Sequence, residues 1–325
     1  MSLRSAAPAL LAALLFGAST PLAKLLGLAM APQLLAGLLY LGSGLGLAVL
    51  MLVRQALPRP VGAPVPQWRI PATDWPWLAA AILAGGVLGP VLLMAGLAST
   101  AAATAALLLN VEGVLTALIA WWVFHENADR QIVLGMAAIL AGAALLSLQP
   151  GAMGWSNGAL LIAAACLCWA IDNNLTRKVA AQDALLLAGL KGLVAGISNT
   201  SLALMLGAKL PAGATLLASL ALGFVGYGLS LVLFVLALRS LGTARTGAYF
   251  SVAPLFGVLV ALLLWPQWPG AAFWLASGLM GLGLWLHLRE RHAHAHVHEA
   301  MAHSHPHRHD AHHQHAHDFV WDGRE

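Results

Sequence analysis

The chain has 325 residues, of which 60% are hydrophobic and only 9% are charged, with a formal net charge of +4. A soluble domain carries roughly 25% charged residues, so the composition excludes an ordinary soluble protein and indicates a polytopic membrane protein. Basic residues in such a protein report its orientation in the bilayer, so the positive charge does not indicate nucleic-acid binding.

Apolar windows of about 20 residues, the length that a helix needs to cross a bilayer, recur along the chain as far as residue 288. They cover 6–28, 32–53, 75–97, 100–124, 131–149, 156–177, 184–206, 213–238, 244–265 and 269–288. The sequence therefore predicts an all-α polytopic membrane protein with ten transmembrane helices. Lys and Arg gather in alternate connections, which predicts that both termini are cytoplasmic. We expect a bacterial inner (plasma) membrane protein.

The first predicted span ends in STPLAK, where Lys24 follows Pro21. A proline removes a backbone donor and disturbs a helix, so we expect free carbonyl groups near a substrate site to which Lys24 contributes. The alternative is that Lys24 is an interfacial lysine at the outer face of the membrane.

The fourth predicted span contains Asn110 and Glu112 in LLLNVEGVLTAL. An ionisable group deep in a bilayer costs about 2.5–3.5 kcal/mol on insertion scales, so Glu112 is a candidate for substrate or proton coupling. The alternative is a carboxylate held in a hydrogen bond between helices. Asn110 is a weaker candidate for the same site, because an amide in an apolar span more often joins two helices.

The sixth predicted span ends in a polar cluster that includes Asp172, Asn173 and Asn174. These groups could bind a polar solute or a cation, or they could simply cap a helix end. Lys191 lies in the seventh span and could reach the membrane surface. It could instead pair with Asp172 or Glu112, which would neutralise a buried charge.

The chain also repeats itself. Residues 97–126 align with 238–267 at an offset of 141, which places Ala253 opposite Glu112; residues 14–25 align with 167–178 at an offset of 153. Each half, 5–149 and 156–288, has five predicted spans, an odd number, so the two halves should be inverted across the membrane. Carriers built this way hold their substrate near the midplane between the halves.

These segments resemble the EamA family of the drug/metabolite transporter superfamily. The resemblance is carried by FGASTPLAKLL in the first span, by LLLNVEGVLTALIAWWVFHENADRQIVLGMAAILAGAALLS in the fourth and fifth, and by AYFSVAPLFGVLVALLLW in the ninth. It implies a transporter and not an enzyme. The chain departs from the family pattern at Gly113, where the family commonly has Pro, and at Gln267, where it commonly has Glu.

The segment 289–325 has no apolar core, so we expect it to be disordered without a ligand. Its histidines mostly alternate with other residues, and imidazoles in this density suit Ni, Zn, Co and Cu. The candidate metal ligands are His292, His294, His296, His298, His303, His305, His307, His309, His312, His313, His315 and His317. Their spacing defines no single closed site.

Together these features predict a secondary transporter that exports a small polar solute, with proton coupling as one option. The resemblance implies that this solute is a metabolite such as an amino acid. Two alternatives stay open, a carrier of divalent transition metals (Ni, Co or Zn) and a membrane metal sensor or scaffold that acts through the tail. We expect a small-molecule or ion substrate, membrane lipid as the surroundings, no nucleic-acid partner and no required cofactor. The sequence does not define an oligomeric state.

Overall fold

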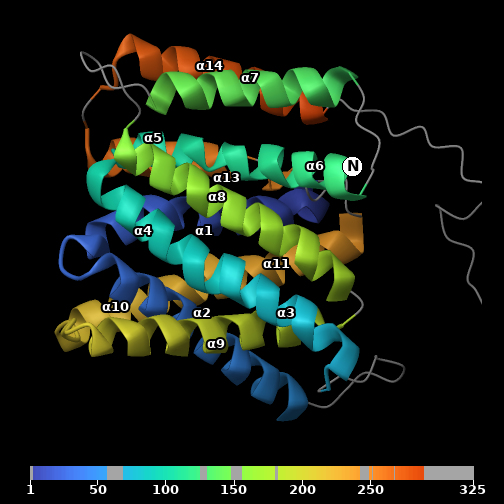
Figure 1. Ribbon diagram of the computed structural model, residues 1–325, viewed down its shortest axis with the longest axis vertical. Helices are drawn as coiled ribbons and strands as arrows, with labels where there is room; N and C mark the ends of the chain where they lie inside the picture. Colours follow the sequence, from blue (N-terminus) through green and yellow to red (C-terminus); the bar gives the residue numbers. More distant parts are fainter. Residues whose placement is uncertain are drawn as a thin grey trace, which may run out of the picture. The chain divides into compact units, whose positions relative to one another are not determined.

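The computed structural model describes residues 3–56, 69–124, 130–147, 156–179, 182–241, 249–250, 252–266 and 268–288. The chain divides into two units, Met1–Glu290 and Arg291–Glu325, and every described residue belongs to the first. The described residues form helices and no strands, as the composition predicts (Figure 1).

The described residues form α-helices, two π-helical segments and two short 3-10 helices. In chain order they are α1 (Leu3–Gly27), α2 (Pro32–Ala56), η1 (Ala72–Asp74), α3 (Trp75–Ala81), η2 (Ile82–Leu88), α4 (Gly89–Ser99), α5 (Ala102–Leu108), α6 (Asn110–Phe124), α7 (Arg130–Ser147), α8 (Asn157–Thr176), η3 (Arg177–Val179), α9 (Ala184–Met205), α10 (Gly213–Leu222), η4 (Gly223–Leu229), α11 (Ser230–Leu241), α13 (Ala253–Leu264) and α14 (Ala271–Leu288).

Within these ranges, seven helical segments are long and apolar enough to cross a membrane. They are Ala7–Gly27, Pro32–Ala56, Ala72–Ser99, Ala102–Val123, Asn157–Thr176, Leu185–Met205 and Gly213–Phe234. Three shorter apolar helices, Val133–Ser147, Ala253–Leu264 and Ala271–Leu286, lie in the fifth, ninth and tenth predicted spans. The described residues thus place an apolar helix in every predicted span, and seven of these helices have full spanning length.

The third and eighth predicted spans are not uniform α-helices. Each contains a π-helical segment, η2 between α3 and α4 and η4 between α10 and α11. In η2 the cause is local, because Gly89 donates its N–H to the carbonyl of Ala84, five residues back, and the next residue, Pro90, has no N–H to donate. π-helical turns are rare and occur frequently at functional sites.

The fourth predicted span is interrupted at Leu109, where α5 ends and α6 begins. The Asn110 side chain donates to the carbonyl of Leu107 at 2.9 Å, so it satisfies a backbone group at the interruption. Glu112 consequently lies in the first turn of a new helix. Sequence periodicity alone predicts one continuous helix here.

The first span behaves in the opposite way. We expect Pro21 to disturb the helix, but α1 continues from Leu3 to Gly27 with both Pro8 and Pro21 inside it. The expectation that Pro21 interrupts the helix is therefore wrong. One missing N–H is tolerated where neighbouring helices pack closely.

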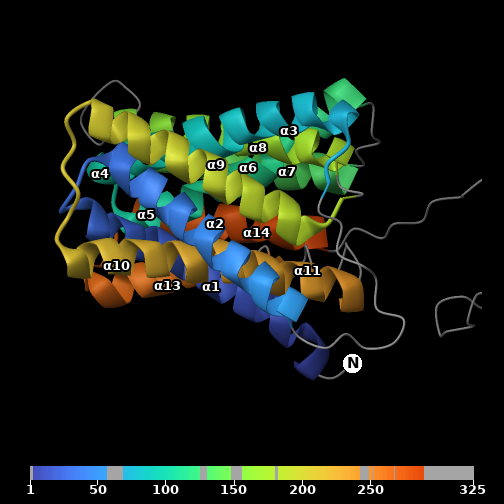
Figure 2. The ribbon, with the colours of Figure 1, turned by 90° about the horizontal axis from the view of Figure 1, so that it is seen from below.

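The helices of the two predicted halves pack against each other. The first helix of each half contacts elements of the other half, since α1 packs on η4, α11 and α13, and α8 packs on η2, α4 and α6. Two further pairs run along each other, α2 with α9 and α7 with α14, and Figure 1 shows α7 and α14 side by side. In Figure 2, α3, α8 and α9 lie on one side of the bundle, and α1, α10 and α13 lie on the other.

Small residues allow the close approach of α2 and α9. A Cβ atom on Gly44 would overlap the backbone of Gly192 and Leu193, and a Cβ atom on Gly196 would overlap the backbone of Leu41. Close packing at small residues associates helices in lipid, where no hydrophobic drive brings them together.

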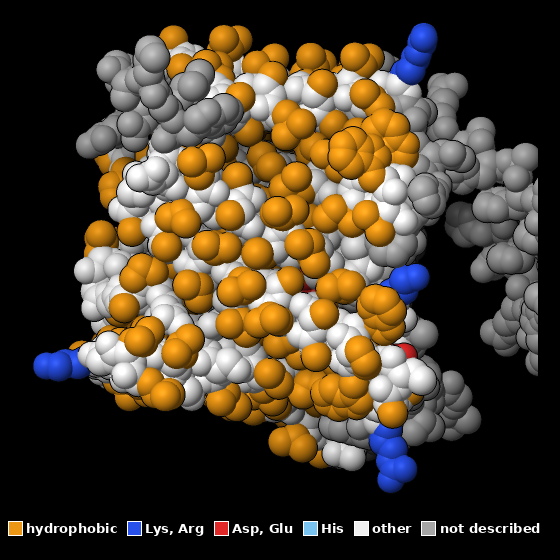
Figure 3. Space-filling view, viewed as in Figure 1, with side chains coloured by type: hydrophobic (Ala, Val, Ile, Leu, Met, Phe, Trp, Pro, Cys, Tyr) orange, Lys and Arg blue, Asp and Glu red, His pale blue; other side chains and the backbone are white. Residues whose placement is uncertain are grey.

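The outer surface of the helices is apolar. Figure 3 shows hydrophobic side chains spread over one face, with Lys and Arg side chains at its margins. Exposed tryptophans lie near helix ends, for example Trp75 and Trp77 at the start of α3 and Trp121 and Trp122 near the end of α6. Tryptophan is enriched at both membrane interfaces, so this surface suits a lipid environment.

Candidate functional site

A buried ion pair joins α8 to α9. Lys191 Nζ donates to both carboxylate oxygens of Asp172, at 2.7 Å from Oδ2, and to Thr176 Oγ1 at 3.1 Å. Thr176 Oγ1 in turn donates to Asp172 Oδ1 at 2.8 Å. The side chains of Lys191 and Asp172 are only 18% and 10% exposed, and all three ammonium donors have an acceptor. Of the two partners that the sequence allows for Lys191, the structure pairs it with Asp172.

Local helix geometry brings these groups together. Asp172 and Thr176 are four residues apart on α8, so they share one face of the helix. The start of α9 is fixed by Asp183, whose carboxylate accepts hydrogen bonds from backbone N–H groups of the first turn, as an N-cap residue does. Lys191 then lies two turns into α9. Both helices pack against η2, so the ion pair forms beside the π-helical segment.

Gly85 in η2 is the point of closest approach to the ion pair. A Cβ atom at this position would overlap the Cβ, Cγ and Oδ2 atoms of Asp172. Only glycine therefore leaves room for the carboxylate between α8 and η2. Because Pro90 lies five residues after Gly85 and cannot donate to it, the Gly85 carbonyl also lacks the π-type backbone bond that Gly89 gives to Ala84.

Side chains from three other helices satisfy the carbonyl groups of η2. The Gly85 carbonyl accepts a hydrogen bond from the Tyr40 hydroxyl at 3.0 Å and another from Trp169 Nε1 at 2.9 Å. The Gly86 carbonyl accepts one from the Asn199 amide at 3.1 Å. Tyr40 lies on α2, Trp169 on α8 and Asn199 on α9, so α2, α8 and α9 converge on η2.

Glu112 belongs to a second polar group, between α6 and α8. Asn173 Nδ2 donates to Glu112 Oε1 at 2.9 Å and lies 3.3 Å from Thr116 Oγ1. Asn174 Nδ2 donates to the carbonyl of Thr116 at 3.2 Å. Glu112 is half-buried and Asn173 is exposed, so this carboxylate is more accessible than that of Asp172. Its place in the first turn of α6 favours negative charge.

Within the described residues, the other two candidates donate hydrogen bonds to backbone carbonyl groups and not to either carboxylate. Among the described residues, Asn110 donates within its own span, to the carbonyl of Leu107. Lys24 lies in the last turn of α1, where Nζ donates to the carbonyl of Leu97 and, at 2.7 Å, to that of Thr100. We expect both residues at the same substrate site as Glu112 and Asp172. Their described partners are backbone carbonyls, so this grouping stays a prediction.

Sequence reasoning does not select several residues of the site, among them Tyr40, Gly85, Trp169 and Thr116. Aromatic and glycine residues are common in membrane spans, so composition does not mark them. The signal that could have found Gly85 is AGGVLGP (84–90), in which a proline follows a glycine at the spacing of a π-type hydrogen bond.

The predicted metal ligands of the tail, His292 to His317, lie outside the described residues. Within the part of the chain that the structure describes, no three His, Cys, Asp or Glu side chains come close enough to hold a metal ion. The ion pair and the Glu112 group are therefore polar sites of a different kind, with one carboxylate each.

Known proteins resemble this chain over most of its length. The model of the EamA-like transporter family matches residues 4–148 and 156–289. An uncharacterized transporter of Methanothermobacter thermautotrophicus is 28% identical over 222 residues, which make up 66% of this chain and 63% of that protein. The match thus spans less than two thirds of the relative's length. A crystal structure of a protein with 21% identity has a TM-score of 0.62 and covers 86% of this chain and 95% of that chain, a likeness that shows the fold.

Proposed function

Because the chain belongs to the EamA-like transporter family, we propose that it is a secondary carrier of the bacterial inner membrane that exports a small polar metabolite. Family membership supports a transporter and not an enzyme. The observation that carries the proposal is the Asp172–Lys191 ion pair, which lies 10% and 18% exposed among apolar helices. Ionisable groups within membrane segments are expensive and mark substrate or ion pathways.

We propose further that residues 5–149 and 156–288 are inverted repeats with both termini cytoplasmic. The π-helical segments support the repeat, since η4 begins and ends 141 positions after η2, at 223 and 229 against 82 and 88. The same offset aligns the two halves in the sequence. It also aligns Gly85 with Gly226, and a Cβ atom on Gly226 would overlap Ser19, which is the counterpart of Asp172 at the offset of 153.

The ion pair favours a zwitterionic substrate such as an amino acid. The carboxylate of an amino acid could bind Lys191 while its ammonium group binds Asp172, so each buried charge would exchange one partner for another. Breaking a buried pair without such a replacement leaves an uncompensated charge, which costs several kcal/mol. The substrate thereby supplies the free energy that opens the pair, and a solute with neither charge does not.

In this scheme Glu112 carries the proton. Its carboxylate is half-buried and is held by the Asn173 amide, and within the described residues it forms no ion pair. Proton binding there changes the charge of the region between α6 and α8 without disturbing the Asp172–Lys191 pair.

We predict that Glu112→Gln abolishes proton-coupled transport while the protein stays folded. The glutamine oxygen can still accept from Asn173 but cannot titrate. The measurement is uptake of amino acids into proteoliposomes under an imposed pH gradient, with Glu112→Asp as the matched variant that keeps a titrating group. Uptake by the glutamine variant that still responds to the gradient would show that the proton is carried elsewhere.

The histidine-rich tail motivates a second candidate, a function in which a transition metal is substrate or signal. We propose that residues 289–325 bind Ni or Zn through neutral imidazoles and release the metal as the pH falls below about 6. Calorimetric titration at a pH of about 7.5 checks binding. A chain that ends at residue 288 should lose metal binding but keep amino-acid transport. A metal sensor that ends at residue 288 should instead lose its response to metal entirely.

A further inference from the structure

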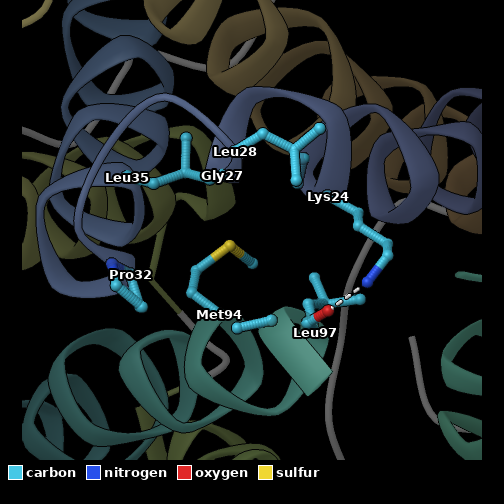
Figure 4. Close-up of a pocket in the computed structure, with 9 residues that line it drawn as sticks. Lys24, Gly27, Leu28, Pro32, Leu35, Met94 and Leu97 are labelled. Atoms are coloured by element: carbon cyan, nitrogen blue, oxygen red, sulfur yellow. Dashed lines mark hydrogen bonds between the residues drawn. The ribbon is translucent and has the colours of Figure 1, made fainter. Parts of the chain in front are cut away.

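Lys24 stands apart from both polar groups of the proposed carrier. It lies in the last turn of α1, and its ammonium group reaches across to backbone carbonyls at the end of α4, as Figure 4 shows for Leu97. Two of its ammonium donors go to the carbonyls of Leu97 and Thr100. An ammonium group has three donors, so within the described residues one is left for another acceptor.

The charge of Lys24 has no full counter-charge in the described part of the chain. Both partners are neutral carbonyls, and no described carboxylate forms an ion pair with it. The end of α4 offers the partial negative charge of a helix C-terminus, about half an elementary charge. An anion would complete the neutralisation.

Two cavities meet at this lysine. The smaller has a volume of about 260 Å³ and lies between α1, the start of α2 and the end of α4, with Leu28, Leu35 and Met94 around it in Figure 4. The larger has a volume of about 440 Å³, which is within the usual range for a small-molecule site. Lys24 lines both of them.

The walls of the larger cavity are chiefly apolar and aromatic. They include Trp265, Trp268 and Phe273, with Thr104 as a polar side chain next to the α5 start. A cavity with one cation at its edge and aromatic rings within it has the chemistry to bind a carboxylate that carries an apolar body. The smaller cavity has no aromatic wall.

We propose that Lys24 and the larger cavity form a second recognition site, which binds an organic carboxylate with an apolar or aromatic body. The ligand carboxylate accepts the remaining Lys24 donor, and its body packs against Trp265 and Phe273. The site is separate from the Asp172–Lys191 pair. Its use in transport, as a point of entry or release, rests on the proposed carrier function, but binding to it does not.

The test is calorimetric titration of the full chain in lipid nanodiscs with phenylacetate. 2-Phenylethanol is the control ligand, because it has the same aromatic part but a neutral hydroxyl in place of the carboxylate. Phenylacetate should bind, and Lys24→Gln should weaken it by roughly 10- to 100-fold, the loss expected for a hydrogen bond to a charged group. Lys24→Arg should keep most of the affinity. The alcohol should bind weakly and respond little to either substitution.

A matched pair of substitutions tests which cavity holds the body without touching Lys24. Ala101 lines the larger cavity and Ala98 lines the smaller. Ala101→Leu should weaken phenylacetate binding, and Ala98→Leu should leave it unchanged. The reverse result, or equal binding of acid and alcohol, overturns the proposal.

If Lys24 only caps α4, Lys24→Gln lowers the unfolding temperature and phenylacetate shows no Lys24-dependent binding. Phenylacetate binding that persists in an Asp172→Asn variant without transport separates this site from the carrier mechanism.

Discussion

Asp172→Ala is expected to lower the free energy of unfolding by about 3–5 kcal/mol, the usual cost of removing one partner of a buried ion pair. The substitution leaves Lys191 charged among apolar helices, with Thr176 Oγ1 as its remaining described acceptor. The effect should be visible as a loss of folded protein during denaturant titration in mixed micelles. Transport should be lost as well.

The control is the double variant Asp172→Asn with Lys191→Met. It removes both charges and keeps an amide that can bond to Thr176, so most of the stability should return, because a buried pair is often no more stable than neutral groups of similar volume. Transport should not return. Equal stability of the single and double variants would mean that Lys191 finds water or another partner, and the pair would then not be the buried element that the proposed function requires.

Gly85→Ala is expected to destabilise the protein by about 1–3 kcal/mol, the range for overpacking a filled interior. The new methyl group would occupy the position of the Asp172 carboxylate, so the carboxylate must move away from Lys191. Transport of a zwitterionic substrate should fall with it. Thermal unfolding and proteoliposome uptake measure the two effects.

Gly113→Ala is the matched control for this substitution. Gly113 is also a helical glycine in an apolar span, but a Cβ atom there meets nothing within 4 Å. Alanine should leave stability unchanged or raise it by up to about 1 kcal/mol through helix propensity. If both alanine variants behave alike, the fit between Gly85 and Asp172 is not what constrains this position.

Much of the architecture follows from hydrophobicity alone. Windows of apolar residues locate the helices because a bilayer admits only segments whose backbone N–H and C=O groups form hydrogen bonds with each other. The internal structure of those helices does not follow. The break at Leu109 and the π-helical turn before Pro90 involve hydrogen bonds of single residues, and a window of about 20 residues averages over them.

The candidate site was predictable only in part. Charged residues in apolar spans are rare, so Glu112, Asp172 and Lys191 stand out in the sequence. Which of them pair depends on the rotation of α8 and α9 about their axes, and that rotation is set by packing on η2. For this reason the choice between Asp172 and Glu112 as the partner of Lys191 stays open until the helices are assembled. The partners of Lys24 are backbone carbonyls, and no pattern of residue types predicts such partners.

The π-helical turns also change the angular phase of their helices. One residue added within a helix rotates everything after it by about 100° about the axis. The faces of α3 and α4, and likewise those of α10 and α11, are therefore offset although each pair forms a single rod. A relative with one residue fewer between positions 82 and 88 would restore the common phase and turn the later half of that rod toward different neighbours, while the proline would still leave one carbonyl without a backbone donor.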